Sequence, residues 1–480
     1  MKKNVALIPA AGRGMRMYPL TKKKPKAMLT IDEKPILQYN LEILKELQVK
    51  EVHIVTGEHG TQIQEYFEDG SDFDLEINYI TQERRKGIGH AIGLGEDYID
   101  YPFFVILGDE MYINTNHKDM LELFENDFNA LCAFKKVSDK TKIKKNYTAD
   151  IQGNTVLSLI EKPQSPVSNL LGVGTYAFNP LVFDYIKRAT PSPLRNEIEI
   201  TDVIDTIART KSKVYAFFLE GDYVNINKIE DLDQATYLWR SSRFDQYTTT
   251  VIIPAYNEQE SIAQVVKDFS IEPVDEILVV DNNSTDRTVQ IARKLNAKVV
   301  SEPAQGYGNA LKRGLNHTEG DILIVTEADA SFRSKDLPRI LEYLKSADMV
   351  IGTRTAKELI EQGAHMDWFL QWGNKAMGNV VKILWWNKKA QFTDVGCTYR
   401  GIWKHAYNRI KDNLESEGAA FSVEMMIEML KTDLKIVEIP VGYYQRHGGE
   451  SKHSSTRLQN FRTGLSMLFI ILKKRFQSTQ

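Results

Sequence analysis

Short apolar runs alternate with helix-like patterns along the whole chain. Two of these runs end in a proline-containing turn, VALIPAAGRG at residues 5–14 and TTTVIIPAYNE at residues 248–258. The other clear runs are EVHIVTG (51–57), FFVILGD (103–109), EILVVDN (276–282) and DILIVTEAD (321–329). Short apolar runs separated by helical patterns predict an α/β fold with mainly parallel sheets covered by helices.

The return of this pattern halfway along the chain predicts two Rossmann-like domains. We expect the first at residues 1–240 and the second at residues 248–480, joined by the polar segment RSSRFDQYTT at 240–249. A length of 480 residues agrees with this division, because one hydrophobic core rarely serves so long a chain. No apolar run reaches the roughly eighteen residues of a membrane-spanning helix, and the first residues lack the apolar core of a secretory signal.

Charge and cysteine content narrow the function. The net charge of −3 argues against a general polyanion binder, so we expect no nucleic-acid partner. Cys132 and Cys397 lie far apart in sequence and do not predict a disulfide framework, which favours a reducing cytoplasm. Residues 446–480 nevertheless hold seven Lys or Arg against one Glu, so this tail suits anionic lipid or phosphate.

The segment AAGRGMRMYPLTKKKPKAM, residues 10–28, carries the richest candidate chemistry. Ala11, Gly12 and Gly14 follow a strand, so backbone N–H groups can approach an anionic phosphate closely. Arg16 and Lys26 stand at opposite ends of the loop and bring fixed cations to the same anion. The alternative is a tight turn with solvated basic residues.

The same segment resembles GxGxRxxPLTxxxPK, the signature of the sugar-phosphate nucleotidyltransferases. Four later segments resemble that family in the same order: QERRKGIGHA, LGD, EKP and GVGTYAF. The resemblance covers residues 3 to about 235, and it specifies the reaction class but neither the base nor the sugar.

This resemblance implies roles for single residues. Gln82 and Gly87 would read the nucleobase, and Asp109 would bind the metal. The sugar-phosphate segment follows, where Glu161 suits the sugar hydroxyls and Lys162 the phosphate. Further along the chain, Gly174 would leave room for the sugar ring.

The second metal ligand departs from the commonest pattern of the family. Many members have an Asp within a W-x-D-x-G-like stretch, whereas this chain has DYVNINKIEDL at 222–232 and places Asn225 there. An amide oxygen is still a hard ligand for Mg²⁺, although a neutral one. The pattern resembles the uridylyltransferases that act on N-acetylglucosamine 1-phosphate, so we expect Asn225 as the ligand, with Asp222 as the alternative.

The implied reaction needs no general base. An oxygen of a sugar 1-phosphate attacks the α-phosphorus of an NTP, and pyrophosphate leaves. Because the attacking phosphate is already ionised at pH 7, catalysis consists of positioning and of charge neutralisation by Mg²⁺, Arg16, Lys26 and Lys162. The product is a nucleotide-sugar.

The second half resembles glycosyltransferase family 2, which has the GT-A fold. The segments that carry the resemblance are TTTVIIPAYNEQESI (248–262) and DEILVVDNNSTDRT (275–288). Pro254 and Tyr256 would shape the turn after the first strand, Glu258 would accept a hydrogen bond from the ribose, and Asp281 would bind the nucleoside. The alternative for VVDNNSTD is a helix N-cap, and both interpretations are compatible.

The segment TEADASF stands where this family has its DxD metal motif. Glu327 and Asp329 follow a strand at positions i and i+2, so together they can hold one divalent cation, Mg²⁺ or Mn²⁺, against a diphosphate. Since Glu replaces the first Asp, Asp329 is the stronger candidate for the catalytic ligand.

Two later segments are GTR at 352–354 and IPVGYYQRHGGESKHSS at 439–455, and they resemble the polyprenyl-phosphate glycosyltransferases related to dolichyl-phosphate mannose synthase. The resemblance implies a phosphorylated acceptor, a polyprenyl phosphate above all. The residues that would bind the donor or acceptor phosphate are Arg354, Arg446, Ser451 and Lys452. Those that would face the acceptor are Asp394 and Arg400. The alternative for Arg446 and Lys452 is solvated surface charge.

Aromatic residues near the C-terminus suggest a lipid surface. Four of the six Trp lie within residues 368–386, and apolar residues recur at helical spacing from Leu458 to Phe476 beside three consecutive basic residues. This pattern predicts an interfacial helix and peripheral contact with the inner face of the membrane. Packing between the domains would explain the same pattern.

Three hypotheses follow. The first is a bifunctional enzyme that makes a nucleotide-sugar and then transfers the sugar to the acceptor, with the fusion raising the local concentration of the intermediate. The second keeps both folds but joins a cytidylyltransferase for a polyol, alcohol or phosphonate to a transferase with a soluble acceptor. The third makes one half a non-catalytic binding module.

Overall fold

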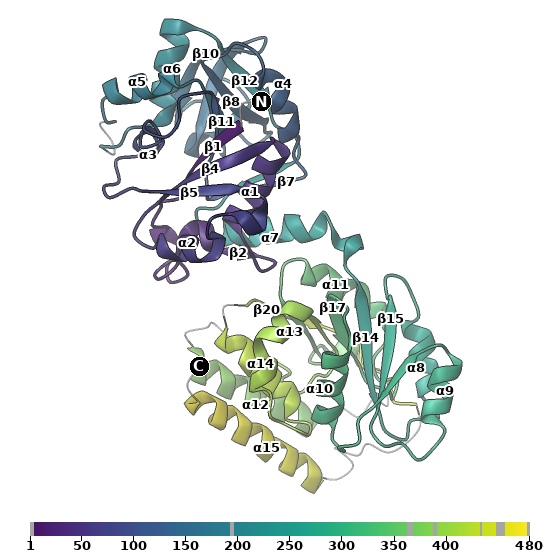
Figure 1. Ribbon diagram of the computed structural model, residues 1–480. Helices are drawn as coiled ribbons and strands as arrows, with labels where there is room; N and C mark the ends of the chain where they lie inside the picture. Colours follow the sequence, from purple (N-terminus) through teal and green to yellow (C-terminus); the bar gives the residue numbers. More distant parts are fainter. Residues whose placement is uncertain are drawn as a thin grey trace. The chain divides into compact units, whose positions relative to one another are not determined.

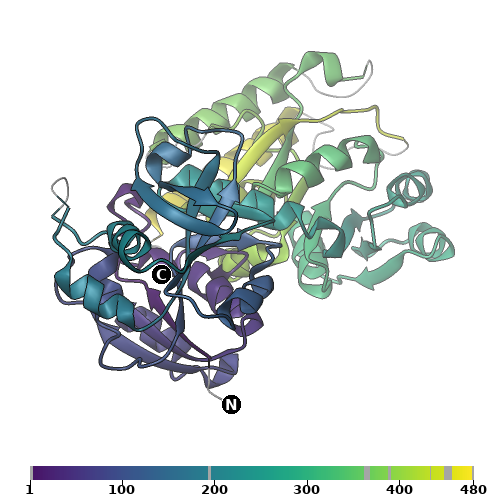
Figure 2. The same cartoon turned by 90° about the horizontal axis from the view of Figure 1, so that it is seen from above.

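The chain forms two compact units, Met1–Ser242 and Arg243–Gln480. The computed structural model describes residues 4–192, 196–361, 368–386, 391–432, 434–447 and 457–477. In both units helices flank a large, mainly parallel sheet (Figures 1 and 2). The prediction of an α/β fold with two Rossmann-like sheets is confirmed.

In the first unit, the described residues form a nine-stranded sheet in the order β5-β4-β1-β6-β11-β8-β12-β10-β9. The strands from β5 to β6 are parallel, and the two innermost of them, β1 and β6, are apolar runs buried on both faces, as parallel strands between helices must be. The strand β11 runs antiparallel to both of its neighbours. The strands are β1 (Asn4–Pro9), β4 (Val49–Thr56), β5 (Glu76–Thr81), β6 (Phe103–Ile106), β8 (Ala130–Lys136), β9 (Tyr147–Gln152), β10 (Thr155–Glu161), β11 (Leu170–Phe178) and β12 (Val214–Phe218).

Two small sheets complete the first unit. The strand β13 (Asp222–Asn225) pairs antiparallel with β7 (Glu110–Ile113), and β2 (Thr30–Ile31) pairs with β3 (Lys34–Pro35). The helices are α1 (Ile36–Glu46), α2 (Thr61–Phe67), α3 (Ile88–Gly93), α4 (Met120–Phe124), α5 (Leu181–Arg188), α6 (Ile200–Lys211) and α7 (Ile229–Ser241).

In the second unit, the described residues form a seven-stranded sheet in the order β16-β15-β14-β17-β19-β18-β20. All pairs are parallel except those of β19, which runs against β17 and β18. The strands are β14 (Thr249–Ala255), β15 (Glu276–Asp281), β16 (Lys298–Ser301), β17 (Ile322–Val325), β18 (Met349–Thr353), β19 (Arg400–Trp403) and β20 (Ile436–Pro440).

Helices cover this second sheet and build a separate layer near the C-terminus. The helix α10 packs on β14 and β15, α11 packs on β18 and β19, and α15 lies against α14 and α12 (Figure 1). The helices are α8 (Ile262–Phe269), α9 (Thr288–Lys294), α10 (Tyr307–His317), α11 (Leu337–Leu344), α12 (Trp368–Leu384), α13 (Lys404–Ile410), α14 (Phe421–Lys431) and α15 (Arg457–Phe476). None of the helices in the described ranges is long and apolar enough to cross a membrane.

Candidate active sites

The first candidate site begins at the loop after β1. Gly14 has a left-handed backbone with φ of +60°, and the Thr21 hydroxyl donates a hydrogen bond of 2.7 Å to its carbonyl oxygen. This folds the loop back over Lys26, whose Cβ lies 3.2 Å from the position of a Cβ on Gly14. Ala11 is buried, whereas the space beside Gly12 is open. The loop therefore offers its backbone at Gly12, as a phosphate-binding loop requires.

Lys26 brings this loop together with the ends of two other strands. Its buried ammonium group lies 2.5 Å from Asp109 Oδ2 and 3.5 Å from Asn227 Oδ1. Asn227 in turn donates a hydrogen bond of 2.7 Å to Asn225 Oδ1. Asp109 directly precedes β7, and the β13–β7 register sets Asn225 opposite Glu110. The exposed Arg16 lies in the short helix Met15–Met17, which directly follows Gly14.

This cluster suits a magnesium ion by its chemistry. Asp109, Asn225 and Asn227 supply one carboxylate and two amide oxygens, all of the hard oxygen type that Mg²⁺ takes in proteins. Within the described residues, no group of three or more His, Cys, Asp or Glu is arranged to hold a metal. A metal bound by this cluster would rely on amides and substrate phosphates beside the single carboxylate of Asp109.

Asn227 was missed by the sequence reasoning, although it stands only two residues after Asn225. The alternative ligand, Asp222, is wrong, because the register pairs it with Ile113 at the opposite end of β7, where it is exposed. Antiparallel pairing over four residues thus separates Asp222 from Asp109 and brings Asn225 to it.

The sugar-phosphate segment joins the same cluster through Asn146. The backbone amide of Lys162 donates a hydrogen bond of 2.7 Å to the backbone carbonyl of Asn146. The side-chain nitrogen of Asn225 lies 3.4 Å from Asn146 Oδ1. The Lys162 ammonium pairs with Glu161 at 2.6 Å, and Thr201 donates to the second Glu161 oxygen. No sequence pattern pointed to Asn146, since a loop distant in sequence supplies it.

The remaining residues assigned to this site, Gln82, Gly87 and Gly174, pack against other residues of the same unit. Gln82 is buried and its amide lies 2.9 Å from His90 Nδ1. Gly87 has a φ of +99°, and a Cβ there would meet the Ile198 carbonyl oxygen at 2.6 Å, so only glycine fits. The prediction that Gly174 leaves room for the sugar ring is wrong, because the side chains of Leu107 and Glu110 fill that space, at 2.5 and 2.6 Å from the point that a Cβ would occupy.

The second candidate site lies at the carboxyl ends of β14, β15 and β17. Pro254 is within β14, and Tyr256 and Glu258 follow it. Asp281 ends β15 opposite Ala255, and its carboxylate accepts a hydrogen bond of 3.0 Å from the Ser284 amide, three residues further along the chain. At 8% exposure, Asp281 still reaches the surface.

Arg446 connects the first and third of these strand ends. One guanidinium nitrogen lies 3.5 Å from Glu258 Oε1 and 3.3 Å from Asp329 Oδ2. The backbone supports this position, since the His447 amide donates to the Asp329 carbonyl at 2.9 Å. Arg446 is therefore part of the site rather than a solvated surface charge.

Glu327 lies beside Asp329 in a buried environment. Burial and the neighbouring Asp329 charge raise the pKa of Glu327 to about 7. Its two oxygens accept hydrogen bonds from the hydroxyls of Thr398, at 2.6 Å, and Ser331, at 3.1 Å. Because both donors belong to the protein, Asp329 is the more available of the two carboxylates for a cation.

Comparison with known proteins identifies both units. Residues 5–242 match the nucleotidyl transferase family, and residues 250–402 match glycosyl transferase family 2. The UTP–glucose-1-phosphate uridylyltransferase AglF of Haloferax volcanii is 32% identical over 231 residues, which cover 48% of this chain and 94% of AglF. The chain belongs to the nucleotidyl transferase family. It continues into a glycosyltransferase domain of family 2, so both units are enzyme domains.

Two further matches each cover about half of this chain. The low-salt glycan biosynthesis nucleotidyltransferase Agl11 of Haloferax volcanii is 37% identical over 234 residues, and the match spans 48% of this chain and 64% of the length of Agl11. A solved UDP-glucose pyrophosphorylase in complex with UDP-glucose is 28% identical, with a TM-score of 0.46, and the match covers 50% of this chain and all of that one.

Two residues of the glycosyltransferase unit, Asp394 and Arg400, are structural, against the prediction that they face the acceptor. Arg354 and the fully buried Asp394 form a two-pronged ion pair, with N–O distances of 2.8 and 3.0 Å. Arg400 is also buried and donates to the carbonyl oxygens of Val395, Cys397 and Ser422. Buried charges require such partners, and these leave Asp394 and Arg400 no face toward a ligand. Ser451 and Lys452 lie outside the described residues.

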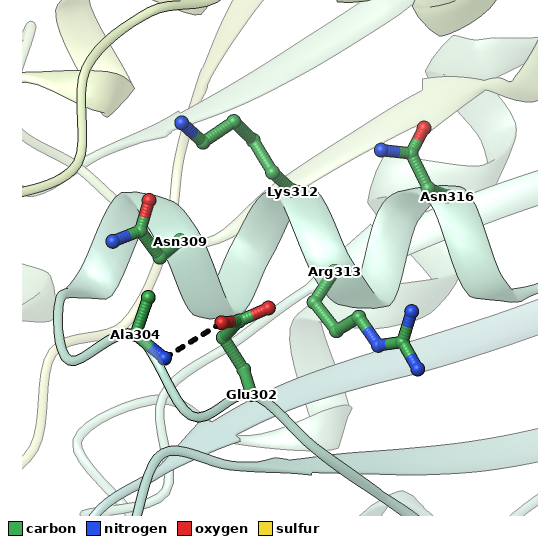
Figure 3. Close-up of a pocket in the computed structure, with 6 residues that line it drawn as sticks. All are labelled: Glu302, Ala304, Asn309, Lys312, Arg313 and Asn316. Atoms are coloured by element: carbon green, nitrogen blue, oxygen red, sulfur yellow. Dashed lines mark hydrogen bonds between the residues drawn. The ribbon is translucent and has the colours of Figure 1, made fainter.

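Two cavities lie in the glycosyltransferase unit. One, of about 240 Å³, is on α10 and is lined by Glu302, Ala304, Asn309, Lys312, Arg313 and Asn316. Figure 3 shows Lys312 and Arg313 pointing away from each other, so they do not converge on one anion. The other, of about 580 Å³, is lined by Glu260, Ala263, Gln264, Lys267, Asp268 and Arg333.

Proposed function

We propose that this chain is a bifunctional enzyme: the first unit makes a nucleotide-sugar from an NTP and a sugar 1-phosphate, and the second transfers the sugar to a polyprenyl phosphate. The observation that carries the first half is the meeting of Lys26, Asp109, Asn225 and the Lys162 segment at one point. These groups would hold a Mg²⁺-bound triphosphate and a sugar phosphate side by side. UTP is the nucleotide we propose, since the relative AglF is a UTP–glucose-1-phosphate uridylyltransferase.

Pyrophosphate release tests the first reaction. The full chain, given Mg²⁺, glucose 1-phosphate and each of the four NTPs in turn, should release pyrophosphate with UTP. Asp109→Asn should lower the rate roughly 100-fold or more, because the removed charge faces the reacting phosphates. Asp222→Asn is the matched control, since this exposed carboxylate lies at the other end of the same strand pair. Equal rates for the two variants would refute the assignment.

The second reaction rests on Glu258, Asp281 and Asp329 at the ends of three neighbouring strands. Arg446 contacts the first and the last of these residues. A cation on Asp329 would neutralise the diphosphate as it leaves the sugar, and Arg446 would bind the same phosphates. UDP-glucose with undecaprenyl phosphate in detergent should yield a lipid-linked sugar. Asp329→Asn should abolish this product, and the exposed Glu319→Gln should not. Transfer to soluble phosphates alone would overturn the lipid acceptor.

We also propose that α12 and α15 form the membrane-contacting face of the glycosyltransferase unit. Neither helix contains Asp or Glu, and several large apolar side chains of this region are exposed. These are Ile383, Trp386, Leu465, Phe469, Leu472 and Phe476. Phe469 is 66% and Phe476 is 84% exposed, with Lys382, Lys473 and Arg475 nearby in sequence. An apolar face with basic residues suits an anionic bilayer surface.

Vesicle sedimentation tests this face. The full chain should bind anionic vesicles made with phosphatidylglycerol and should bind pure phosphatidylcholine more weakly. Replacing Phe469 and Phe476 together by Ser should release the protein. Phe218→Ser removes an exposed phenylalanine of the first unit and should change nothing. Release by Phe218→Ser, or none by the double variant, would disprove the assignment.

A further inference from the structure

Glu110 is a buried carboxylate directly behind the nucleotidyltransferase site. It follows Asp109 in the chain and is 2% exposed, so it cannot reach the substrates itself. The sequence resemblance gave it no role. A buried carboxylate requires hydrogen-bond donors, and their origin shows what the side chain connects.

The three donors to Glu110 come from three different strands. The Gly174 amide of β11 donates to Oε2 at 2.8 Å, and the Tyr112 hydroxyl of β7 donates to the same oxygen at 2.6 Å. The Tyr223 hydroxyl of β13 donates to Oε1 at 2.7 Å. The absent side chain of Gly174 makes this approach possible, since a Cβ there would lie 2.6 Å from Oε2.

These contacts join the small sheet to the large one. The β13–β7 pair holds Asn225 and begins directly after Asp109, yet it is a separate sheet from the nine-stranded one that carries the phosphate loop and Glu161. Glu110 reaches across this division to β11, the strand next to β6 in the large sheet. The carboxylate therefore fixes where the two oxygen ligands stand relative to the rest of the site.

We propose that Glu110 is a positioning residue for nucleotidyl transfer, which holds Asp109 and Asn225 in place for the metal-bound nucleotide by tying β7 and β13 to β11. The proposal rests on the proposed function of the first unit. It predicts that Glu110 acts through these two ligands and that losing either tyrosine link has a smaller effect of the same kind.

Glu110→Gln is the sharpest perturbation because it keeps the size of the side chain. A carboxylate can accept all three hydrogen bonds, whereas the amide nitrogen of glutamine accepts none. At least one of the three hydrogen bonds is then lost or must reverse its direction, with a tyrosine hydroxyl accepting from the amide, so the ties between the strands weaken. Tyr223→Phe removes only the link to β13, which bears Asn225.

Two measurements on the full chain test the proposal. Water proton relaxation with Mn²⁺ and UTP reports the nucleotide-bound metal held by the protein, and all variants carry Asp329→Asn to silence the second candidate metal site. Pyrophosphate release then gives kcat and KM separately. Glu110→Gln should weaken Mn²⁺–UTP binding and lower kcat by about tenfold or more, as removal of groups that orient metal ligands typically does. Tyr223→Phe should also weaken Mn²⁺–UTP binding and lower kcat, by smaller factors.

Tyr147→Phe is the matched control. It also removes a buried tyrosine hydrogen bond, 3.0 Å long, to the Val173 carbonyl of β11, but it touches neither β7 nor β13. It should lower the melting temperature without weakening Mn²⁺–UTP binding. The proposal is overturned if Glu110→Gln binds and turns over within about twofold of the parent, or if Tyr147→Phe loses as much. If Glu110→Gln does not fold, Tyr223→Phe decides alone, and a parent chain that releases no pyrophosphate refutes the proposed function instead.

Discussion

Replacing Lys474 by methionine should loosen the C-terminal helix α15 from the glycosyltransferase unit. This helix is unusual in burying a lysine while exposing Phe469, Leu472 and Phe476. Lys474 is 1% exposed, and its ammonium group lies 2.9 Å from Glu424 and 3.2 Å from Glu428, both on α14. Burial alone would lower the pKa of Lys474, but these two carboxylates outweigh it and raise the pKa.

The size of this loss of stability depends on the partners that Glu424 and Glu428 keep after the substitution. Removing one partner of a buried ion pair typically costs about 3–5 kcal/mol. Glu424 keeps two backbone donors, the amides of Glu415 and Ser416, and Glu428 keeps Lys431 at 3.0 Å. We therefore expect the lower end, about 3 kcal/mol of local stability.

Hydrogen exchange measures this local stability directly. At about 1.4 kcal/mol per tenfold change, amides of α15 should exchange on the order of 100-fold faster in Lys474→Met. The control is the neighbouring Lys473→Met, because Lys473 pairs with Glu415 at the surface, where an ion pair contributes about 1 kcal/mol or less. Equal protection of α15 in the two variants would show that the buried ion cluster does not hold the helix.

Three further substitutions test the structure of each unit. Burial lowers the pKa of His117 to about 3 from the ordinary 6.5, so between these pH values the unfolded chain binds one more proton than the folded chain. The free energy of unfolding therefore falls by about 1.4 kcal/mol per pH unit on acidification. His117→Gln should flatten this slope in urea titrations from about pH 7 down to about pH 5. Arg354→Lys keeps the charge but loses the second hydrogen bond to Asp394, and should cost about 2 kcal/mol in urea unfolding, with an unchanged midpoint as the contrary result. Gly87→Ala should lower the free energy of unfolding by about 1–3 kcal/mol, since the φ of +99° and the Ile198 carbonyl leave no room for a Cβ. It should also weaken UTP binding in calorimetry, and an unchanged affinity would show that this loop does not contact the nucleotide.

Ordered motifs were the strongest information in the sequence. Apolar runs buried on both faces must become central parallel strands, and the residues after them must meet at one edge of the sheet. The resemblance of the ordered motifs to two known families grouped Lys26, Asp109 and Asn225 before any coordinates, and likewise Glu258 and Asp329. The two fold units follow from the alternation of apolar runs and helical patterns, which begins again halfway along the chain.

Antiparallel register and side-chain packing were decided only by the tertiary structure. The pairing of β13 with β7 chose Asn225 over Asp222, because a strand of four residues carries its two ends to different places. Burial turned Asp394 and Arg400 into structural groups, since a charge taken from water must find partners within the protein. Glu110 is the clearest case: two of its three donors, Gly174 and Tyr223, come from strands distant in sequence, and no local pattern records that they meet.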